Sequence, residues 1–541
     1  MKVAKESKLC HIAVKQYTIK RIMKNIKLRE LLYHEIEKLD LTRWDQTKRR
    51  WAKILGTIPK NSEVMTAYQE LVANSKLAPN EELENSLKTR STRTMSGVAP
   101  FAVMMGAFKC PGNCIYCIQE KGMPKSYMSD EPAAARAKKL NFDPYNQVKS
   151  RLEQFEITGH NPQKLQIIII GGTFSAYPKD FASNFIKSIY DACNNKIAKN
   201  IEEAIDINET AHYRVVGMSI ETRPDWIKED EIVFLRKHGI TKVQLGVQSI
   251  DEKVLITIQR GHSNDEIVKA TKMLRNAGFK INYHLMPNLP GATPKSDISG
   301  IKEIFANENY RPDTLKIYPT IVLPNTKLYE MYQREEYKPW CDDILMNTLA
   351  KMKQYVPRYC RIDRLVRDIT KKWTMVGTKQ TNMRDVVKRY MKQNKLICNC
   401  IRCREIKGNI ENEEIKLQKI EYKANEGKEV FISYESENFL YAMLRLRLGE
   451  IKSQAKNLFP ILERAALIRE VQSFGKQIQI STKSKDSAQH RSFGKKLIAE
   501  AEKIAKANNF TKIAIISGVG VREYYQKLGY RLEDTYMVKN V

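Results

Sequence analysis

The chain has no long apolar run and comparatively few acidic residues. Its 541 residues contain no uninterrupted apolar stretch of about 18, the length that a membrane-spanning helix needs. Short runs such as Ile167–Ile170 end at glycine instead. Lys2, Lys5 and Lys8 are not followed by an apolar segment, so we predict no secretory signal. These absences predict a cytoplasmic protein that does not bind membranes.

The deficit of acidic residues gives the chain a large positive charge. Lys and Arg number 92 against 62 Asp and Glu, so the formal net charge is +30 at pH 7. Such an excess favours a polyanionic partner such as nucleic acid, since phosphate contacts supply affinity without sequence specificity. The alternative is that the basic residues serve solubility alone.

Cysteine is also scarce, with ten residues in the whole chain. In a long chain without a secretory signal, this number argues against a disulfide framework and favours metal binding by reduced thiols. The length predicts two to four domains, because a single hydrophobic core does not grow to this size.

Residues 1–92 are predicted to form a basic helical region. The first 60 residues contain 16 Lys and Arg against 6 Asp and Glu, and Tyr17–Leu39 places apolar residues at helical spacing. Trp44 and Trp51 flank the run Lys48-Arg49-Arg50. The pattern indicates either a solvated helical face or a nucleic-acid-binding face whose aromatic rings stack on unpaired bases. The sequence leaves both interpretations open.

Between about residues 98 and 325, short β-rich runs alternate with helical stretches. The expected strands are Val98–Met105, Leu165–Ile170, Arg214–Ile220, Lys242–Val247, Lys280–Met286 and Thr314–Tyr318, with helices such as Tyr177–Asn194 and Asp265–Ala277 between them. This alternation predicts an α/β fold with a parallel sheet that forms a partial or full barrel. The active site of such a sheet lies at the C-terminal ends of its strands. Residues 326 to about 395 look helical.

A second, smaller α/β domain is predicted from about residue 414. Antiparallel strands are expected at Glu429–Glu435, Phe439–Leu448 and Ala466–Val471. A long helix, Phe493–Asn508, and a strand, Lys512–Ser517, follow before a short helix and a terminal strand. This domain is separate from the barrel because its pattern of strands is antiparallel rather than βα.

The first cysteine motif predicts an iron–sulfur cluster. Cys110, Cys114 and Cys117 have the spacing C-x3-C-x2-C directly after the first expected strand. Three thiolates can hold three irons of a [4Fe–4S] cluster and leave the fourth iron open. An open iron can chelate S-adenosylmethionine, and electron transfer then gives a 5′-deoxyadenosyl radical. The alternative is a structural zinc site, which usually needs a fourth ligand that is not found nearby.

Polar residues and glycines follow the neighbouring expected strands. Gly171 and Gly172 end the second strand, where backbone groups can meet the methionine amino group of the cofactor. Glu221 and Arg223 end the third strand, and Gln248 ends the fourth, so all three can face the mouth of the barrel. Their alternative role is a buried network of ion pairs or hydrogen bonds.

The C-terminal domain has the features of a coenzyme A site. Gln489–Gly494 approximates the Q-x-x-G-x-G turn of acetyl-CoA-dependent acyltransferases, with Ser492 in place of the first glycine. Backbone N–H groups at such a helix start bind pyrophosphate. One of Tyr524 and Tyr525 is expected near the thioester sulfur as a proton donor, and the other in the core. The strand Leu467–Ser473 would offer backbone groups to the pantetheine arm.

Several stretches in this order resemble the catalytic subunit of Elongator, a family that forms carboxymethylated wobble uridine in tRNA. The matching stretches are RTMSGVA (93–99), CIYC (114–117), PKSY with DEPAAARA (124–137), IIIGGTF (168–174), SIETRPD (219–225), LGVQSI (245–250), RGH (260–262), MPNLPG (286–291), LKIYPT (315–320), ISGVG (516–520) and YYQKLGYRL (524–532). They extend from about residue 93 to residue 541.

The resemblance implies a fold and a reaction. A radical SAM partial barrel with a helical extension would occupy 93–385, a zinc-binding linker 386–412 and a GNAT-like acetyl-CoA-binding domain 413–541. The radical would abstract hydrogen from the methyl of acetyl-CoA, and the carbon radical would add to C5 of uridine 34 of tRNA. The family has also been described as a histone acetyltransferase, which is the alternative function. The electron donor is not identified by the sequence, and a homodimer is among the assemblies that we consider.

The resemblance also implies roles for individual residues. Cys110, Cys114 and Cys117 would hold the cluster, and Lys164 would contact acetyl-CoA from the radical domain. The other acetyl-CoA residues would be Glu470, Val471, Gln472, Ser473, Phe493, Gly494, Lys495 and Tyr525.

A structural zinc ion is implied at Cys398, Cys400 and Cys403, with Cys341 or Cys360 as the fourth ligand. We expect the zinc to fix the angle between the domains, so that the open iron faces the thioester. Two motifs depart from the family: Cys117-Ile-Gln-Glu replaces CPGG, and Glu470-Val-Gln-Ser-Phe-Gly475 replaces ELHVYG.

Overall fold

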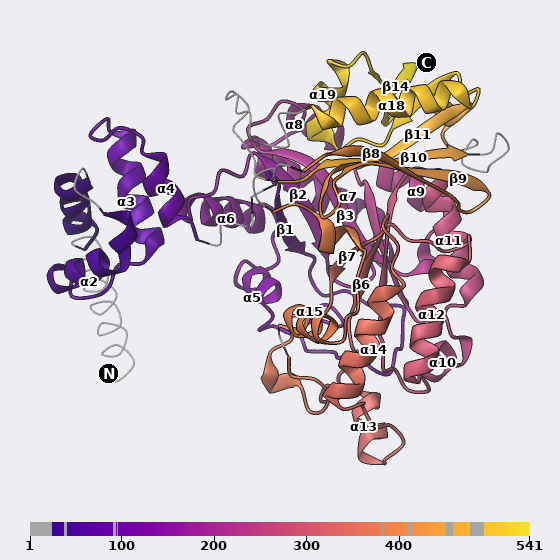
Figure 1. Ribbon diagram of the computed structural model, residues 1–541. Helices are drawn as coiled ribbons and strands as arrows, with labels where there is room; N and C mark the ends of the chain where they lie inside the picture. The colour runs from indigo at the N-terminus through magenta and orange to yellow at the C-terminus, as the bar shows by residue number, and fades with distance from the viewer. Residues whose placement is uncertain are drawn as a thin grey trace. The chain divides into compact units, whose positions relative to one another are not determined.

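The computed structural model describes residues 24–36, 40–89, 94, 96–380, 382–407, 413–449, 458–475 and 492–541 (Figure 1). The chain divides into two compact units. The smaller unit comprises Met1–Thr94 and Ser150–Pro162, and the larger unit comprises Met95–Lys149 and Gln163–Val541. The turn at 489–491, which belongs to the predicted coenzyme A motif, lies outside the described residues.

The smaller unit is helical and has its own core. Its helices after residue 40 are η2 (Leu41–Arg43), α2 (Trp44–Leu55), α3 (Asn61–Ala73) and α4 (Glu81–Leu87). Helix α2 ends at Gly56, whose φ of 73° is the left-handed conformation that glycine adopts at little cost. Helix α4 begins at Asn80, whose side chain accepts a hydrogen bond of 3.0 Å from the backbone N–H of Leu83.

Both tryptophans of the predicted basic face belong to this core. Trp51 has no exposed surface and Trp44 has 8% exposed, and their rings meet edge to face at 5.6 Å. Trp51 Nε1 donates to Glu35 at 2.9 Å. Of the two interpretations, stacking of these rings on unpaired bases is therefore excluded, because burial in the core leaves no face free for a base. The basic residues between them remain on the surface or at its edge.

The larger unit begins with a parallel sheet of seven strands in the order β1-β2-β3-β4-β5-β6-β7. The strands are β1 (Ala99–Met104), β2 (Lys164–Ile170), β3 (Arg214–Thr222), β4 (Lys242–Gln248), β5 (Lys280–Leu285), β6 (Thr314–Ile317) and β7 (Arg361–Arg364). The helices are α5 (Pro132–Lys139), α6 (Pro144–Ile157, of which the part from Ser150 belongs to the smaller unit), α7 (Lys179–Asn194), α8 (Ile201–Asn208), α9 (Glu229–Lys237), α10 (Glu252–Thr257), α11 (Asn264–Asn276), α12 (Pro294–Ala306), α13 (Lys327–Gln333), α14 (Asp342–Gln354) and α15 (Met383–Gln393). Each strand pairs with the next one along the chain, as a partial βα barrel requires.

All six strands predicted for the barrel are present. The seventh, β7, was missed because the sequence Arg-Ile-Asp-Arg offers only one apolar residue. On β2 the outward-facing Leu165, Ile167 and Ile169 are buried, whereas Lys164 and Gln166 on the inner face are partly exposed. A two-residue period of this kind places the helices on one face and a more polar interior on the other.

A second sheet of mixed direction follows, in the order β13-β14-β12-β11-β10-β9-β8. Its strands are β8 (Lys416–Lys423), β9 (Gly427–Glu435), β10 (Leu440–Gly449), β11 (Ala465–Ser473), β12 (Lys512–Ile515), β13 (Arg531–Glu533) and β14 (Tyr536–Asn540), with helices α16 (Ile401–Arg404), α18 (Phe493–Ala507) and α19 (Arg522–Gln526). The sequence pattern predicted β9–β12 and a single terminal strand, which is β14. It did not predict the three-residue β13, or β8, which is mostly exposed.

The parallel strands β11 and β12 pair along only part of their length. The paired residues run from Ala465–Lys512 to Ile468–Ile515, and Ile516 N–H still donates to Ile468 O at 3.2 Å. Beyond this point β11 continues to Ser473 while β12 has ended. The last part of β11 therefore has an edge that β12 does not pair with.

A buried ion network joins the two sheets of the larger unit. Arg469 on β11 contacts both Asp313, which precedes β6, and Glu429 on β9. A Cβ at Gly518, after β12, would clash with the backbone carbonyl of Val216 on β3. The second sheet therefore packs against the amino-terminal ends of the barrel strands. No helix in the described ranges combines the length and apolar character needed to cross a bilayer.

Candidate active site

The three cysteines of the first motif lie on a loop after β1 that is anchored in the core. Ile115, which lies between Cys114 and Cys117, is buried and joins a cluster with Ile258 and Leu328. Its N–H donates to Ile258 O at 3.2 Å, and its carbonyl accepts from Leu328 N–H at 3.0 Å. Backbone bonds on both sides thus fix the loop at the carboxyl-terminal ends of the strands.

The cysteine loop lies beside two guanidinium groups. Arg260 donates to Cys114 Sγ at 3.3 Å. Burial disfavours the Cys114 thiolate, but the charge and hydrogen bond of Arg260, together with Tyr116 and Arg223, outweigh it, so the pKa of Cys114 lies below its usual value. Burial and the neighbouring Cys114 raise the pKa of Cys117 to about 12. Cys114 is therefore more easily ionised than Cys117, whose thiolate would be stabilised by a bound cation.

Buried polar atoms without partners surround this loop. Within the described ranges, Arg223 Nη1, Gln248 Oε1 and both ring nitrogens of His262 are buried and make no hydrogen bond. A Cβ at Gly112 would lie 2.5 Å from Arg223 Nη1, so glycine is needed for this approach. Unsatisfied buried groups are costly and point to a missing polar partner. The residues thus fit a bound cluster and a polar cofactor, and Arg223 and Gln248 lie where the sequence predicted them.

Gly171 and Gly172 lie at the carboxyl end of β2, as predicted. Their φ angles of 141° and 93° favour glycine, and a Cβ at Gly171 would lie 3.0 Å from the Cβ of Met105. Thr173 Oγ1 lies 3.8 Å from Cys110 Sγ, so the end of β2 meets the cysteine loop.

Glu221 lies in a charged cluster inside the barrel mouth. It accepts hydrogen bonds from Tyr127 Oη at 2.6 Å and from Lys316 Nζ at 3.0 Å, and His284 Nε2 lies 4.0 Å away. Burial opposes its charge, but Lys316 and the other neighbours hold the pKa of Glu221 at about 2. Burial, together with Lys316, lowers the pKa of His284 to about 3. The alternative interpretation of Glu221 as part of a buried network therefore holds in the structure.

The sequence did not reveal the partners of Glu221. Tyr127 and Lys316 lie in PKSY and LKIYPT, which the resemblance quoted without assigning roles. Lys316 is at the third position of a four-residue strand, and this position alone does not distinguish a lysine in the interior from one in solvent.

The predicted coenzyme A turn begins helix α18. Ser492 has φ 56° and ψ 26°, the left-handed conformation that glycine adopts more cheaply. Phe493 is buried against Tyr434, with ring centroids 4.6 Å apart, and Lys495 is exposed. Gly494 faces Tyr524, whose Oη would lie 3.2 Å from an added Cβ. The free N–H groups of this first turn are available to a phosphate.

The predicted acetyl-CoA strand, Glu470–Ser473, lies on β11 where it has parted from β12. Val471, Gln472 and Ser473 are partly exposed. The side chain of Glu470 is already used, because it accepts from Arg445 at 2.8 Å and lies 3.6 Å from Lys280 Nζ. Only its backbone is free for a pantetheine arm.

The two adjacent tyrosines have different surroundings. Tyr525 is 7% exposed and packs against Tyr530, and burial raises the pKa of Tyr525. Tyr524 is 37% exposed and lies next to Gly494. The role of Tyr525 at the thioester stays a prediction, and the geometry also brings Tyr524 to the turn.

Lys164 and the cysteine loop lie at opposite ends of the barrel. Lys164 is the first residue of β2, and burial together with Arg214 lowers its pKa. The seven residues of β2 span roughly 20 Å at the usual rise per residue. Since β11 also contacts the amino-terminal ends of the strands, the predicted acetyl-CoA residues do not lie at the mouth with the cysteines. The positions of these residues therefore do not support the expectation that the open iron faces the thioester directly.

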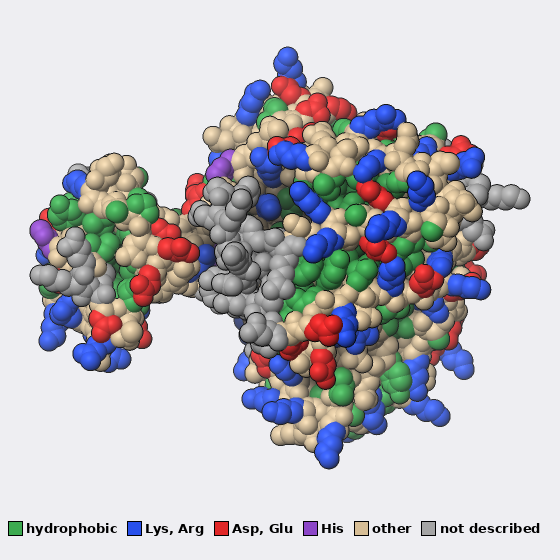
Figure 2. Space-filling model, turned by 45° about the horizontal axis from the view of Figure 1, so that its top comes forward, with side chains coloured by type: hydrophobic (Ala, Val, Ile, Leu, Met, Phe, Trp, Pro, Cys, Tyr) green, Lys and Arg blue, Asp and Glu red, His purple; other side chains and the backbone are tan. Residues whose placement is uncertain are grey.

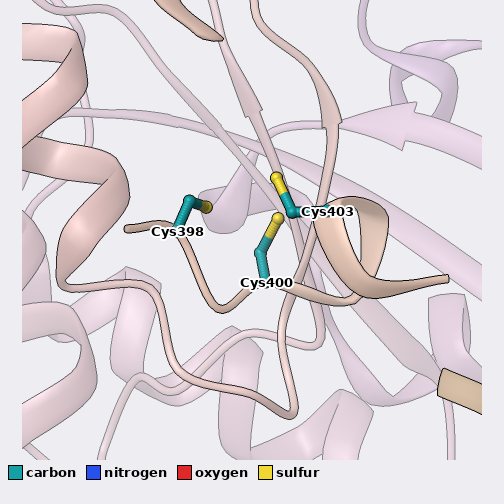
Figure 3. A group of neighbouring side chains, drawn as sticks. All are labelled: Cys398, Cys400 and Cys403. Atoms are coloured by element: carbon teal, nitrogen blue, oxygen red, sulfur yellow. The ribbon is translucent and has the colours of Figure 1, made fainter. Parts of the chain in front are cut away.

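The second cysteine motif brings three sulfur atoms together, as Figure 3 shows. Within the described ranges, Cys398, Cys400 and Cys403 are the group of three or more potential ligands whose ligand atoms all lie within 4.8 Å of one another. Tetrahedral zinc with Zn–S bonds of about 2.3 Å requires such closeness. Cys360 and Cys341 are not members of this group, although the backbone carbonyl of Cys360 accepts from Ile401 N–H at 2.9 Å. The fourth ligand is therefore not among these three clustered sulfur atoms.

The surface agrees with the positive charge of the chain. Figure 2 shows Lys and Arg side chains spread over the face in view, with Asp and Glu among them. On α2 of the smaller unit, Arg49 and Lys53 are exposed one helical turn apart. Lys48 and Arg50 are not free, since Lys48 lies 2.9 Å from Asp45 and Arg50 pairs with Glu35.

The chain is similar to known proteins along nearly its whole length. The Radical SAM superfamily matches residues 106–298, and the Radical_SAM C-terminal domain matches residues 312–393. The tRNA uridine(34) acetyltransferase of Methanocaldococcus infernus is 40% identical over 547 residues, covering 97% of this chain and 98% of that protein. The human Elongator complex protein 3 is 35% identical, covering 84% of this chain and 86% of that protein.

A solved structure supports the same relationship. The archaeal Methanocaldococcus infernus Elp3 with an N-terminal deletion (1–46) superposes with a TM-score of 0.73 at 39% identity, over 83% of this chain and all of that chain. The similarity therefore includes both sheets of the larger unit.

Proposed function

The chain belongs to the family of the tRNA uridine(34) acetyltransferases and Elongator complex protein 3, and on that premise we propose that it is a radical S-adenosylmethionine enzyme acting on uridine 34 of tRNA. Acetyl-CoA is its co-substrate. The observation that carries the proposal is the cysteine loop at the carboxyl ends of a radical SAM barrel, surrounded by buried polar atoms that lack partners.

In this proposal Cys110, Cys114 and Cys117 hold a [4Fe–4S] cluster. When bound, the cluster would supply the electron for cleavage of the sulfonium C–S bond of S-adenosylmethionine, which gives methionine and a 5′-deoxyadenosyl radical able to abstract hydrogen from the acetyl methyl. Arg260 stabilises the Cys114 thiolate through its hydrogen bond of 3.3 Å. Gly171 and Gly172 leave backbone groups open to the methionine end of the cofactor, and Arg223 and Gln248 offer it the buried hydrogen-bonding atoms that have no partner in the protein.

The chain's own residues also position the acetyl donor. The first turn of α18, with Phe493, Gly494 and Lys495, binds the pyrophosphate. Backbone groups of Val471, Gln472 and Ser473 hold the pantetheine arm along the free edge of β11, since β12 no longer pairs with them. Tyr525 donates a proton at the thioester sulfur.

The tRNA is bound largely through phosphate contacts. The net charge of +30 supplies the attraction. Arg49 and Lys53 on α2 are the exposed cations of the smaller unit that we assign to this surface. The tryptophans of that helix serve its core and not the RNA.

A structural zinc ion is proposed at Cys398, Cys400 and Cys403. The support is the closeness of the three sulfur atoms. The fourth ligand is a water molecule or another exogenous donor, because neither Cys341 nor Cys360 joins the group. The ion holds the chain between β7 and β8 in place.

Nucleoside analysis tests this function directly. Unmodified tRNA is incubated anaerobically with reconstituted enzyme, reductant, S-adenosylmethionine and acetyl-CoA, and its nucleosides are measured by mass spectrometry. We expect carboxymethylated uridine that requires both small molecules. A protein lysine acetyltransferase would leave the tRNA unmodified and acetylate protein without S-adenosylmethionine, and that result would contradict the proposal.

A further inference from the structure

A series of aromatic rings lies beside the first cysteine motif. The ring of Tyr177 stacks on Phe108, with centroids 4.8 Å apart, and on Phe181, with centroids 5.7 Å apart. Phe185 continues the series at 6.3 Å from Phe181. We call these four residues the aromatic stack: Phe108, Tyr177, Phe181 and Phe185. Its rings come from the loop after β1 and from the start of α7, so two separate segments of the chain build it.

Tyr177 fixes the aromatic stack at the carboxyl-terminal ends of the barrel strands. Its hydroxyl lies within hydrogen-bonding distance of Gly106 O, at 2.7 Å, and of Gly171 O, at 3.2 Å. Gly106 follows β1 and Gly171 follows β2. Phe108 is two residues before Cys110, and two residues of extended chain span at most about 7 Å. The aromatic stack is therefore next to the proposed radical site.

The two ends of the aromatic stack are exposed, although its other members are buried. Tyr177 keeps 7% of its surface exposed and Phe185 keeps 4%. Phe108 keeps 44% and Phe181 keeps 46%, even though each packs against a neighbouring ring. Apolar surface in water costs free energy, so exposed rings on a fixed support indicate a surface that a partner covers.

The surroundings of Phe108 favour an unpaired nucleic-acid base as this partner. Lys109 is exposed and lies directly between Phe108 and Cys110 in the chain. An aromatic face beside a cation is the combination that binds single-stranded nucleic acid, because the ring stacks on a base and the cation meets the backbone phosphate. An aliphatic partner would not require a ring whose orientation is fixed by stacking.

The other end of the aromatic stack has the opposite charge. Asp180, next to Phe181, is exposed, and the neighbouring Lys179 is already paired with Glu231. A free carboxylate repels phosphate. The two ends therefore have nearly equal exposure, and only the end at Phe108 suits a nucleic acid.

We infer that the ring of Phe108 stacks on a base directly adjacent to uridine 34 in the anticodon loop, with Lys109 at the backbone phosphate. This inference rests on the proposed function, because it takes the tRNA as the ligand. An enzyme that does chemistry on a base takes this base out of its stack, and the adjacent base is left with a free face. Phe108 covers that face and holds the loop in place while uridine 34 occupies the barrel mouth.

A double-mutant cycle on the cluster-loaded full chain tests the stacking. Phe108→Leu removes the ring face and keeps an apolar side chain. The tRNAs are assembled from synthetic halves, and each carries an abasic nucleotide directly before or directly after uridine 34. Dissociation constants are measured at one salt concentration, because phosphate contacts depend on salt. A side chain and a base that touch give non-additive changes in binding.

On tRNA with all its bases, Phe108→Leu should weaken binding at least about fivefold, the size expected for one base on an aromatic ring. On the tRNA that lacks the stacked base, the same substitution should change affinity by less than about twofold, because the contact is already lost. Phe108→Trp, which keeps an aromatic face, should bind at least as tightly as the unchanged chain. The matched control Phe181→Leu should show no coupling to either abasic nucleotide.

Iron content and Tm are measured for every variant, and Phe108→Met provides a second side chain without a ring if leucine disturbs the cysteine loop. If the variants without a ring weaken binding equally for the complete tRNA and for both abasic tRNAs, Phe108 touches neither base. The stacking is then overturned, while tRNA binding and the proposed function stand. If the unchanged chain binds no tRNA, the proposed function is itself contradicted, and the stacking with it.

Discussion

Asp313 and Arg469 form a two-point ion pair with no exposed surface, at 2.8 Å and 2.5 Å between their oxygen and nitrogen atoms. Asp313 precedes β6 of the barrel, and Arg469 lies on β11 beside the predicted acetyl-CoA residues. Arg445 lies 3.6 Å from the same carboxylate. One aspartate thus serves two arginines of the second sheet and fixes it to the barrel.

Replacement of Asp313 by Asn should destabilise the larger unit. The change keeps the shape of the side chain but leaves two buried cations with one anion fewer, which costs about 3–5 kcal/mol. Thermal unfolding followed by circular dichroism should show a lowered Tm. The control is Glu336→Gln, which breaks an exposed pair with Arg334 and should change stability by at most about 0.5 kcal/mol. Equal Tm values for the two variants would contradict the structural role of the pair.

Asp297 predicts a specific pH dependence of stability. Burial raises the pKa of Asp297 to about 7, against about 3.9 in an unfolded chain. The folded state therefore binds an extra proton between about pH 4 and pH 7, and stability contributed by this group falls as the pH rises through that range. Asp297→Asn removes the effect while an amide oxygen can still accept from Asn288 N–H.

The difference in Tm between Asp297→Asn and the unchanged chain should consequently become more positive from about pH 5 to about pH 8. A difference that stays constant over this range would mean that the carboxylate is ionised in the folded protein throughout. This difference in Tm is measured by thermal scans in buffers of matched ionic strength.

The zinc proposal predicts metal content. Cys403→Ser should lower zinc from about one per chain to near zero, since two thiolates hold the ion poorly. Cys360→Ser and Cys341→Ser should keep the metal, because neither sulfur belongs to the group of three. Elemental analysis after removal of loosely bound metal provides the measurement. Loss of zinc from Cys360→Ser would instead identify Cys360 as the fourth ligand.

The smaller unit should contribute to tRNA affinity through charge. Reversal of Lys48, Arg49 and Arg50 together is expected to weaken binding, but it also breaks the pairs of Lys48 and Arg50 within the unit. The double change Arg49→Glu and Lys53→Glu is cleaner, since both side chains are exposed. It should reduce the slope of log affinity against log salt by about 2 and leave the Tm and the iron content unchanged. Unchanged affinity would remove α2 from the RNA surface.

The strands and the cysteine loop could be predicted from local sequence patterns. The contacts that join the two sheets could not. The Val- and Ile-rich runs of β2 and β4 predicted strands, and the spacing of Cys110, Cys114 and Cys117 predicted the metal loop. Asp313 and Arg469 are 156 residues apart, and no local signal pairs them.

Two features of the chain show which information the sequence lacks. The arrangement of Trp44 and Trp51 around a basic run fits an RNA surface and a helical core equally well, and only packing decides between them. The resemblance led us to expect the open iron opposite the thioester, but sequence alone does not show that the donor strand lies at the amino-terminal end of the barrel, where Lys164 also lies. The contacts of β11 supply that information.

Deuterium transfer from acetyl-CoA to 5′-deoxyadenosine tests the central claim most directly. The reconstituted enzyme is given tRNA, S-adenosylmethionine and acetyl-CoA with a fully deuterated methyl group, and 5′-deoxyadenosine is analysed by mass spectrometry. The account predicts a product one deuterium heavier than the unlabelled compound, and none in Cys110→Ala, whereas Cys341→Ala behaves as the unchanged chain. Unlabelled 5′-deoxyadenosine alone, or acetyl transfer to protein that survives in Cys110→Ala, would contradict it.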